Sequence, residues 1–255
     1  GLALLLVVVL VVWAFRAYAR GHAVRRAAVF SGALILTEAL IGAGLVLFRM
    51  VADNASTARA LWMSAHLINT FALLAALVLT AWCASGGKPA RWRGQGALGW
   101  LLAASFAATV VLAVSGAVAA LGDTLFPSKS LAEGLSADLS PTSHLLIRLR
   151  LLHPLLAVLV GGLLLVTSLA ASRLRPGVWV GRWMWTLTAF VLVQLAVGVA
   201  NVYLLAPVWM QLVHLLLADL LWLALVLLAA SALSERATNL EEGLEHLELG
   251  AAARS

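Results

Sequence analysis

The chain has 255 residues, of which 63% are hydrophobic and 11% are charged, and its mean hydropathy is +1.02. A soluble domain of this length cannot bury so much apolar side chain, so an ordinary soluble protein is excluded. The net charge is +6, but the positive residues lie mostly in short segments between apolar stretches, which is typical of membrane proteins and argues against nucleic-acid binding.

Apolar stretches of about 20 residues recur along the whole chain, and each is long enough to cross about 30 Å of hydrocarbon. Because backbone groups inside lipid must be hydrogen-bonded within the protein, these stretches predict an all-α, polytopic membrane protein. We predict seven spans, at about 1–18, 26–50, 58–84, 96–121, 145–171, 181–204 and 208–233. The first stretch begins at Gly1 without a basic flank or cleavage site. We therefore expect a helix entered partway through, in a longer protein, rather than a signal peptide.

Charge in the loops predicts the orientation of these spans. The first, third and fifth loops and their borders hold many basic residues, namely Arg16, Arg20, Arg25, Arg26, Lys88, Arg91, Arg93, Arg173, Arg175 and Arg182. The loops at 51–57 and 122–144 are acidic or mixed. Basic loops stay in the cytoplasm, so segment 122–144 is predicted to face outward across a bacterial or archaeal plasma membrane. The acidic tail, 234–255, is predicted to be cytoplasmic and to form a short surface helix.

Two parts of the chain resemble each other in sequence. Residues 38–42 (EALIG) resemble 194–198 (QLAVG), and the stretch that follows His66 resembles the stretch that follows His214. The order of the elements is kept, which predicts parallel repeats about an axis along the membrane normal. A four-helix bundle would then occur twice, and the first copy would lack its first helix. We divide the chain into an N-terminal bundle (1–94), a C-terminal bundle (95–233) and the tail.

Three of the six histidines, His66, His153 and His214, lie inside predicted spans, some six to nine residues from the outer end. At 1.5 Å per residue this is a depth of roughly 9–13 Å. Ionisable side chains within a membrane usually have a function. The alternative is a neutral histidine bonded to a neighbouring helix, which explains three histidines at one depth less well. His22 and His246 are expected to be solvated, and a contact between His144 and a ligand edge is left open.

The spacing of these histidines favours heme over zinc. A zinc site needs three or four clustered ligands, but here each histidine lies on a separate span. Two histidines that face each other across a helix bundle suit bis-imidazole ligation of heme iron. Arg148 and Arg150 lie about one turn before His153 and would pair with heme propionates. Cations that extend toward the membrane surface are the competing explanation for both arginines.

Three stretches carry a family resemblance: GAVAALGDTLFP from Gly116, LRLLHP from Leu149 to Pro154, and NVYLLAPVWMQLVHLLLADLLW from Asn201. Together with the repeat, they resemble the heme A synthase family over about residues 20–233. The resemblance implies oxidation of the C8 methyl group of heme O to the formyl group of heme A, for cytochrome oxidase assembly. It also implies that His153 and His214 hold heme b and that His66 is a ligand of the substrate heme O.

The resemblance also implies a Glu-x-x-His motif whose histidine would fall about eight residues before Gly1. Because the catalytic glutamate belongs to that motif, this chain alone is expected to be inactive. The family's cysteine pairs are absent, since Cys83 is the single cysteine. Glu38 stands where the family usually has Gln, and it would be either structural or close to the substrate heme.

Two other functions remain as alternatives. A membrane cytochrome b that carries electrons without modifying heme would explain the histidines equally well. A transporter is disfavoured, because the prolines lie in loops or near the ends of spans rather than near the midplane. The expected partners are heme O, the heme O synthase, an electron donor that the sequence does not identify, and the lipid bilayer. No nucleic acid is expected, and homo-oligomerisation is left open.

Overall fold

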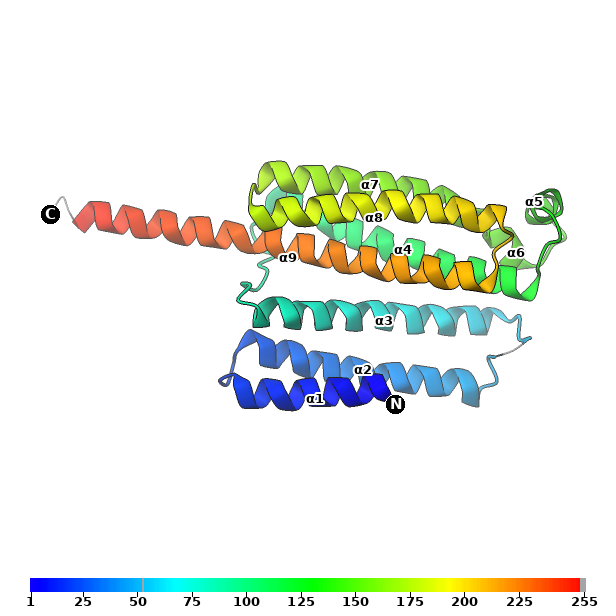
Figure 1. The fold of residues 1–255 in the computed structure, drawn as a ribbon, viewed down its shortest axis with the longest axis horizontal. Helices are drawn as coiled ribbons and strands as arrows, with labels where there is room; N and C mark the ends of the chain where they lie inside the picture. Colours follow the sequence, from blue (N-terminus) through cyan, green and yellow to red (C-terminus); the bar gives the residue numbers. More distant parts are fainter. Residues whose placement is uncertain (52, 253–255) are drawn as a thin grey trace.

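The computed structural model describes residues 1–51 and 53–252, with side chains as far as Ser234. Every regular element within these residues is a helix, which confirms the all-α prediction. Seven long helices lie side by side (Figure 1): α1 (Leu2–Ala17), α2 (Ala23–Leu47), α3 (Thr57–Ala84), α4 (Gly96–Leu125), α7 (Leu152–Leu174), α8 (Val178–Tyr203) and α9 (Val208–Ala252). Two short helices, α5 (Leu131–Leu139) and α6 (Leu145–Leu149), lie in the connection between α4 and α7.

Six segments are long and apolar enough to cross a membrane: Ala23–Leu47, Thr57–Ala84, Gly96–Leu125, Leu145–Leu174, Val178–Tyr203 and Val208–Ser234. The chain is therefore a multi-pass membrane protein. The predicted first span corresponds to α1, which has only 16 residues. At 1.5 Å per residue, that is roughly 24 Å, short of the roughly 30 Å of hydrocarbon. That the first predicted span, 1–18, crosses the membrane therefore stays a prediction.

The predicted fifth span, 145–171, is not one continuous helix. α6 ends at Leu149 and α7 begins at Leu152. Pro154 explains the break, because it has no N–H to donate to the carbonyl of Arg150 and its ring would clash with that carbonyl. The carbonyl instead accepts a hydrogen bond from the His153 amide, at 3.3 Å. His153 therefore lies at the start of a helix, rather than two turns inside one as the sequence predicted.

The last predicted span does not end near residue 233. α9 continues as one helix of 45 residues to Ala252 and extends beyond the other helices (Figure 1). The tail is therefore helical as predicted, but it continues α9 instead of forming a short helix of its own. The acidic side chains of the tail and the side chain of His246 lie outside the described residues.

The long helices pack in two groups. α4, α7, α8 and α9 form a closed ring, in which each helix contacts the next. α1, α2 and α3 form a row, and α3 joins this row to α4 and α9 (Figure 1). At the junction, Trp222 of α9 stacks on Phe71 of α3 with ring centres 4.7 Å apart, and its indole N–H donates to the Phe71 carbonyl at 2.8 Å.

The connections between helices alternate between the two ends of the molecule (Figure 1). One end, here called the basic end, holds the α1–α2, α3–α4 and α7–α8 connections and the start of the α9 extension. The opposite end, here called the histidine end, holds the α2–α3 and α8–α9 connections together with α5 and α6. His66, His153 and His214 all lie within the first three turns of helices that start at the histidine end.

Candidate heme sites

His153 of α7 and His214 of α9 face each other inside the ring of four helices. Their ring centres are 6.3 Å apart and their ring planes are 85° apart. When two imidazoles bind one metal from opposite sides, each metal–nitrogen bond is about 2.0 Å long. Each ring centre lies about 1.1 Å beyond its nitrogen, so the two ring centres are roughly 6.2 Å apart. The observed separation therefore fits two axial ligands of one heme iron.

A serine on α4 contacts the first ring. The Ser115 hydroxyl lies 2.7 Å from the Leu112 carbonyl and 3.0 Å from His153 Nδ1. A hydroxyl has one proton, and the carbonyl can only accept it. When that proton goes to the carbonyl, the hydroxyl oxygen accepts from Nδ1–H, and the Nε2 lone pair of His153 is free to bind a metal.

Glycines lie against the rings of all three histidines, and at His153 and His214 a larger residue would crowd the ring. A Cβ atom on Gly116 would lie 2.9 Å from Cε1 of His153, which is too close for carbon atoms. A Cβ on Gly198 would lie 3.2 Å from Cε1 of His214, and a Cβ on Gly42 would lie 3.7 Å from Cε1 of His66. Small residues let helices approach closely in membranes, and here they admit a ring from the next helix.

The second ring of the pair is held through an amide on α8. Gln194 donates from Nε2 to the His214 carbonyl at 3.1 Å, and the same nitrogen lies 3.3 Å from Nε2 of the ring. His214 Nδ1 and Gln194 Oε1 are buried without a hydrogen-bond partner among the described residues. Unpaired buried polar atoms are costly, so this site fits a further ligand that would rearrange these groups.

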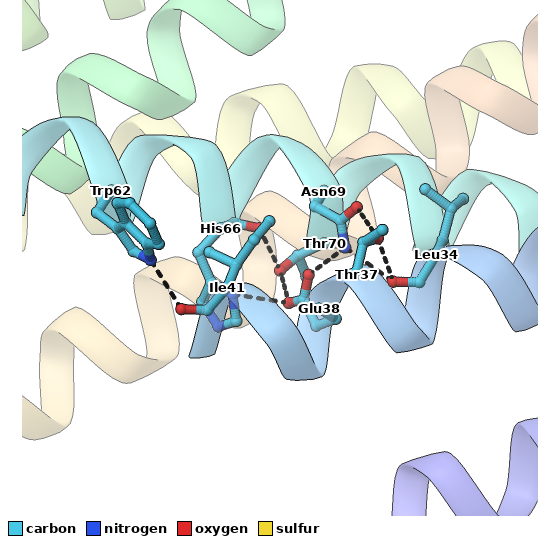
Figure 2. Close-up of polar contacts among 8 residues, drawn as sticks. All are labelled: Leu34, Thr37, Glu38, Ile41, Trp62, His66, Asn69 and Thr70. Carbon is cyan, nitrogen blue, oxygen red and sulfur yellow. Dashed lines mark hydrogen bonds and ion pairs between the residues drawn. The ribbon is translucent and has the colours of Figure 1, made fainter. Parts of the chain in front are cut away.

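His66 of α3 lies away from that pair, beside α2. Its Nδ1 is 3.5 Å from Oε1 of Glu38, and Glu38 also contacts Asn69 and Thr70 (Figure 2). Nearby, the indole of Trp62 donates to the Ile41 carbonyl at 2.7 Å and fixes α3 against α2 (Figure 2). The imidazole of His66 is 36% exposed, so one side of it is open to a ligand.

The two arginines predicted to bind propionates lie in different surroundings. Arg150 holds two carboxylates: it donates from Nε and Nη2 to Asp138 of α5, at 2.9 and 2.7 Å, and from Nη1 to Asp123 of α4, at 2.9 Å. Its side chain is only 9% exposed. One N–H of Nη2 is left for a propionate, and a bidentate propionate would have to replace one of the present acceptors. Arg148 is exposed.

Two of the other histidines cap helices. The Nδ1 atom of His144 accepts from the Leu146 amide at 3.3 Å and begins α6, and that of His22 accepts from the Val24 amide at 3.3 Å and begins α2. Both therefore have a local structural role that explains their presence. Among the described residues, no group of three or more His, Cys, Asp or Glu side chains gathers as a metal cage.

A family model described as COX15-CtaA, cytochrome oxidase assembly protein, matches residues 1–226. The chain belongs to this family. The resemblance seen in the sequence is thereby confirmed. In this member of the COX15-CtaA family, the matched range includes all three intramembrane histidines, His66, His153 and His214.

Two curated proteins, from two strains of Thermus thermophilus, are also similar to this member of the family. Each is named protoheme IX farnesyltransferase and is 49% identical over 250 residues, which are 98% of this chain and 40% of the relative. The chain thus spans about two fifths of the length of these relatives. No solved structure gives a significant match.

Sequence reasoning did not predict several groups that shape the two sites of this COX15-CtaA protein. They are the Ser115 hydroxyl, the glycines that make room for the rings, and the polar neighbours of Glu38. The repeat did contain a signal for two of the glycines, because Gly42 and Gly198 occupy the same place in the paired stretches. Ser115 had no such signal, since its role depends on how α4 packs against α7.

Proposed function

We propose that this chain is the heme-oxidising part of a heme A synthase, which converts the C8 methyl group of heme O to the formyl group of heme A. The observation that carries the proposal is the His153–His214 pair, with ring centres 6.3 Å apart, in a member of a cytochrome oxidase assembly family. In this proposal the pair holds heme b, a one-electron carrier. Ser115 keeps the His153 proton on Nδ1, and Gly116 admits the ring.

The proposal assigns unequal roles to two halves of the chain. In the N-terminal half (1–94), Glu38 and Gly42 of α2 lie against His66 of α3. In the C-terminal half (95–233), Gln194 and Gly198 of α8 lie against His214 of α9, although Gln194 contacts Nε2 of its ring where Glu38 contacts Nδ1. This correspondence supports the predicted parallel repeat. The C-terminal half would hold heme b, and the N-terminal half would bind heme O through His66.

The name of the relatives supports the choice of substrate. A protoheme IX farnesyltransferase, as those proteins are named, adds a farnesyl group to the heme periphery, and the farnesylated product is heme O. A heme O synthase is therefore the partner that would supply the substrate, and an electron donor not yet identified would complete the reaction. The basic end would face the cytoplasm, where the C-terminal tail would also lie, and the heme sites would lie near the outer face of the plasma membrane.

The first experiment tests heme b. The purified chain, reconstituted with hemin in detergent, is expected to show a low-spin bis-imidazole spectrum. His153→Ala and His214→Ala should each abolish that spectrum, because one axial ligand is lost. A low-spin spectrum that survives both substitutions would show that the C-terminal site is wrong.

The second experiment distinguishes the synthase from an electron-carrying cytochrome b. Hemes are extracted from membranes that contain a protoheme IX farnesyltransferase and the chain extended by the residues encoded before Gly1, and are separated by chromatography. Heme A should form. A low-spin spectrum without any heme A would favour the electron carrier.

A further inference from the structure

Four polar side chains meet between α2 and α3 beside His66 (Figure 2). Thr37 and Glu38 come from α2, and Asn69 and Thr70 come from α3. We call these four residues the Glu38 cluster. A carboxyl group inside a membrane span is costly, so its surroundings show what keeps it there.

Asn69 connects the cluster and leaves no polar atom unused. Its amide nitrogen donates to the Leu34 carbonyl at 3.0 Å and to Oε2 of Glu38, and its oxygen lies 2.7 Å from the Thr37 hydroxyl (Figure 2). An amide NH₂ has two protons and both have acceptors here, which fixes the orientation of the amide. Oε2 of Glu38 is therefore held in one place.

The other oxygen of Glu38 lies between the Thr70 hydroxyl and His66. Thr70 Oγ1 contacts Oε1 and also lies 3.0 Å from the His66 carbonyl. Nδ1 of His66 is 3.5 Å from Oε1, and it is buried with no hydrogen-bond partner among the described residues. A shift of the imidazole by about half an ångström would bring this pair within normal hydrogen-bond distance.

The C-terminal half has no counterpart of this cluster. In the repeat, Gln194 takes the place of Glu38, and His214 takes the place of His66. The residue before Gln194 is Val193, and the residues three and four positions after His214 are Leu217 and Ala218. Each of the three polar neighbours of Glu38 is thus replaced by an apolar residue. The carboxyl group and its supports belong to the His66 half alone.

We propose that Glu38 is the positioning residue for His66: it accepts the Nδ1–H of the imidazole and directs Nε2 toward the iron of the bound heme. The proposal rests on the proposed function in one respect, which is that His66 is a heme ligand. Asn69 and Thr70 hold the carboxyl group in place, so it can orient the ring before heme arrives. A histidine becomes a stronger ligand when the ring nitrogen that does not bind the metal donates to a carboxyl group. The heme at His66 should therefore have a lower reduction potential than the heme at the C-terminal pair.

The test compares Glu38→Gln with the unaltered chain, both reconstituted with hemin in nanodiscs. Glu38→Gln has nearly the same shape and gives the N-terminal site the residue found at the C-terminal site. We expect the affinity for hemin at the His66 site to fall roughly 10- to 100-fold and its midpoint potential to rise. The heme at the C-terminal pair serves as the internal control, and its spectrum and potential should not change.

His66→Ala shows which bound hemin belongs to the His66 site. It also distinguishes a failure of the proposed role of Glu38 from a failure of the N-terminal heme site itself. If His66→Ala removes one bound hemin while Glu38→Gln leaves both affinity and potential unchanged, the role of Glu38 is refuted and the proposed function stands. If His66→Ala leaves hemin binding unchanged, the N-terminal heme site itself is wrong, and the role of Glu38 falls with it. A purely structural role for Glu38 would lower the thermal stability of the protein and leave the potential of the His66 heme where it was, which also refutes the proposal.

Discussion

Replacing Gly116 by alanine is the sharpest steric test of the C-terminal site. The added Cβ would lie 2.9 Å from Cε1 of His153 and 3.4 Å from both ring nitrogens. Carbon atoms in contact are normally about 3.5–4.0 Å apart, so the ring has to move by roughly 0.6–1.1 Å. Functional groups must usually be held within about 0.5 Å of their working position. Gly116→Ala should therefore displace the axial ligand.

The effect on folding should be small, because two contributions oppose each other. Alanine stabilises a helix interior by about 1 kcal/mol relative to glycine, whereas overpacking usually costs about 1–3 kcal/mol. We therefore expect a melting temperature close to that of the unaltered protein, together with a hemin affinity reduced roughly 10- to 100-fold. Hemin titration followed by the low-spin absorbance band measures the affinity, and thermal unfolding in detergent measures the stability.

The other two glycines provide a graded control. Gly198→Ala brings a Cβ to 3.2 Å from Cε1 of His214, so its effect should be smaller. Gly42→Ala brings a Cβ to 3.7 Å from Cε1 of His66, an ordinary contact, and should leave hemin binding unchanged. If Gly116→Ala binds hemin as tightly as the unaltered chain, or if Gly42→Ala weakens binding more than Gly116→Ala does, the steric reasoning is wrong.

Three further predictions concern the supports of the sites. Arg150→Gln should destabilise the segment between α4 and α7 by about 3 kcal/mol, because two carboxylates lose their partner. Limited proteolysis should then cut this segment faster. Unchanged cleavage would show that Arg150 does not hold the segment in place. Trp222→Phe keeps the stacking on Phe71 but loses the indole hydrogen bond, so it should cost about 1 kcal/mol, whereas Trp222→Ala should cost about 3–5 kcal/mol in thermal unfolding. Ser115→Ala removes the hydroxyl that faces Nδ1 of His153 and should weaken hemin binding. The free energy of unfolding should fall by no more than about 1 kcal/mol. If this variant binds hemin with full affinity, Ser115 does not control the tautomer of His153.

The sequence predicted the elements that depend on local composition. Apolar length determines whether a helix can cross a membrane, and six of the predicted spans meet that criterion. Local sequence also contained the signal for the break before α7, since Pro154 cannot continue a helix through Arg150. Hydropathy still predicts one span there, because it averages over a single break, and Leu145–Leu174 is indeed one candidate span with that break inside it. The length of α9 was missed for a related reason, since charged residues continue a helix as well as apolar ones do.

The candidate heme sites show where sequence alone stops. Three histidines in apolar spans indicated heme, and the repeat paired His66 with His214 as corresponding residues. Only the packing of α7 against α8 and α9, in a ring with α4, brings His153 to within 6.3 Å of His214. Sequence spacing could not give that distance, because the two residues are 61 positions apart and lie on different helices.

The same limit applies to charges and small side chains. The sequence predicts that Arg150 binds a propionate, but it contains no sign of the ion pairs with Asp123 and Asp138, which are brought close only by the folded α4–α7 connection. Glu38 could be recognised in the sequence as an unusual carboxyl group in a span. Its contact with His66 and its support by Asn69 depend on the crossing of α2 and α3. Composition and apolar length thus predicted a helical membrane protein with histidines inside its spans, because both follow from properties of single segments. Which side chains meet was decided by helix packing, because hydrogen bonds, ion pairs and ligand pairs act only over a few ångströms between segments far apart in the sequence.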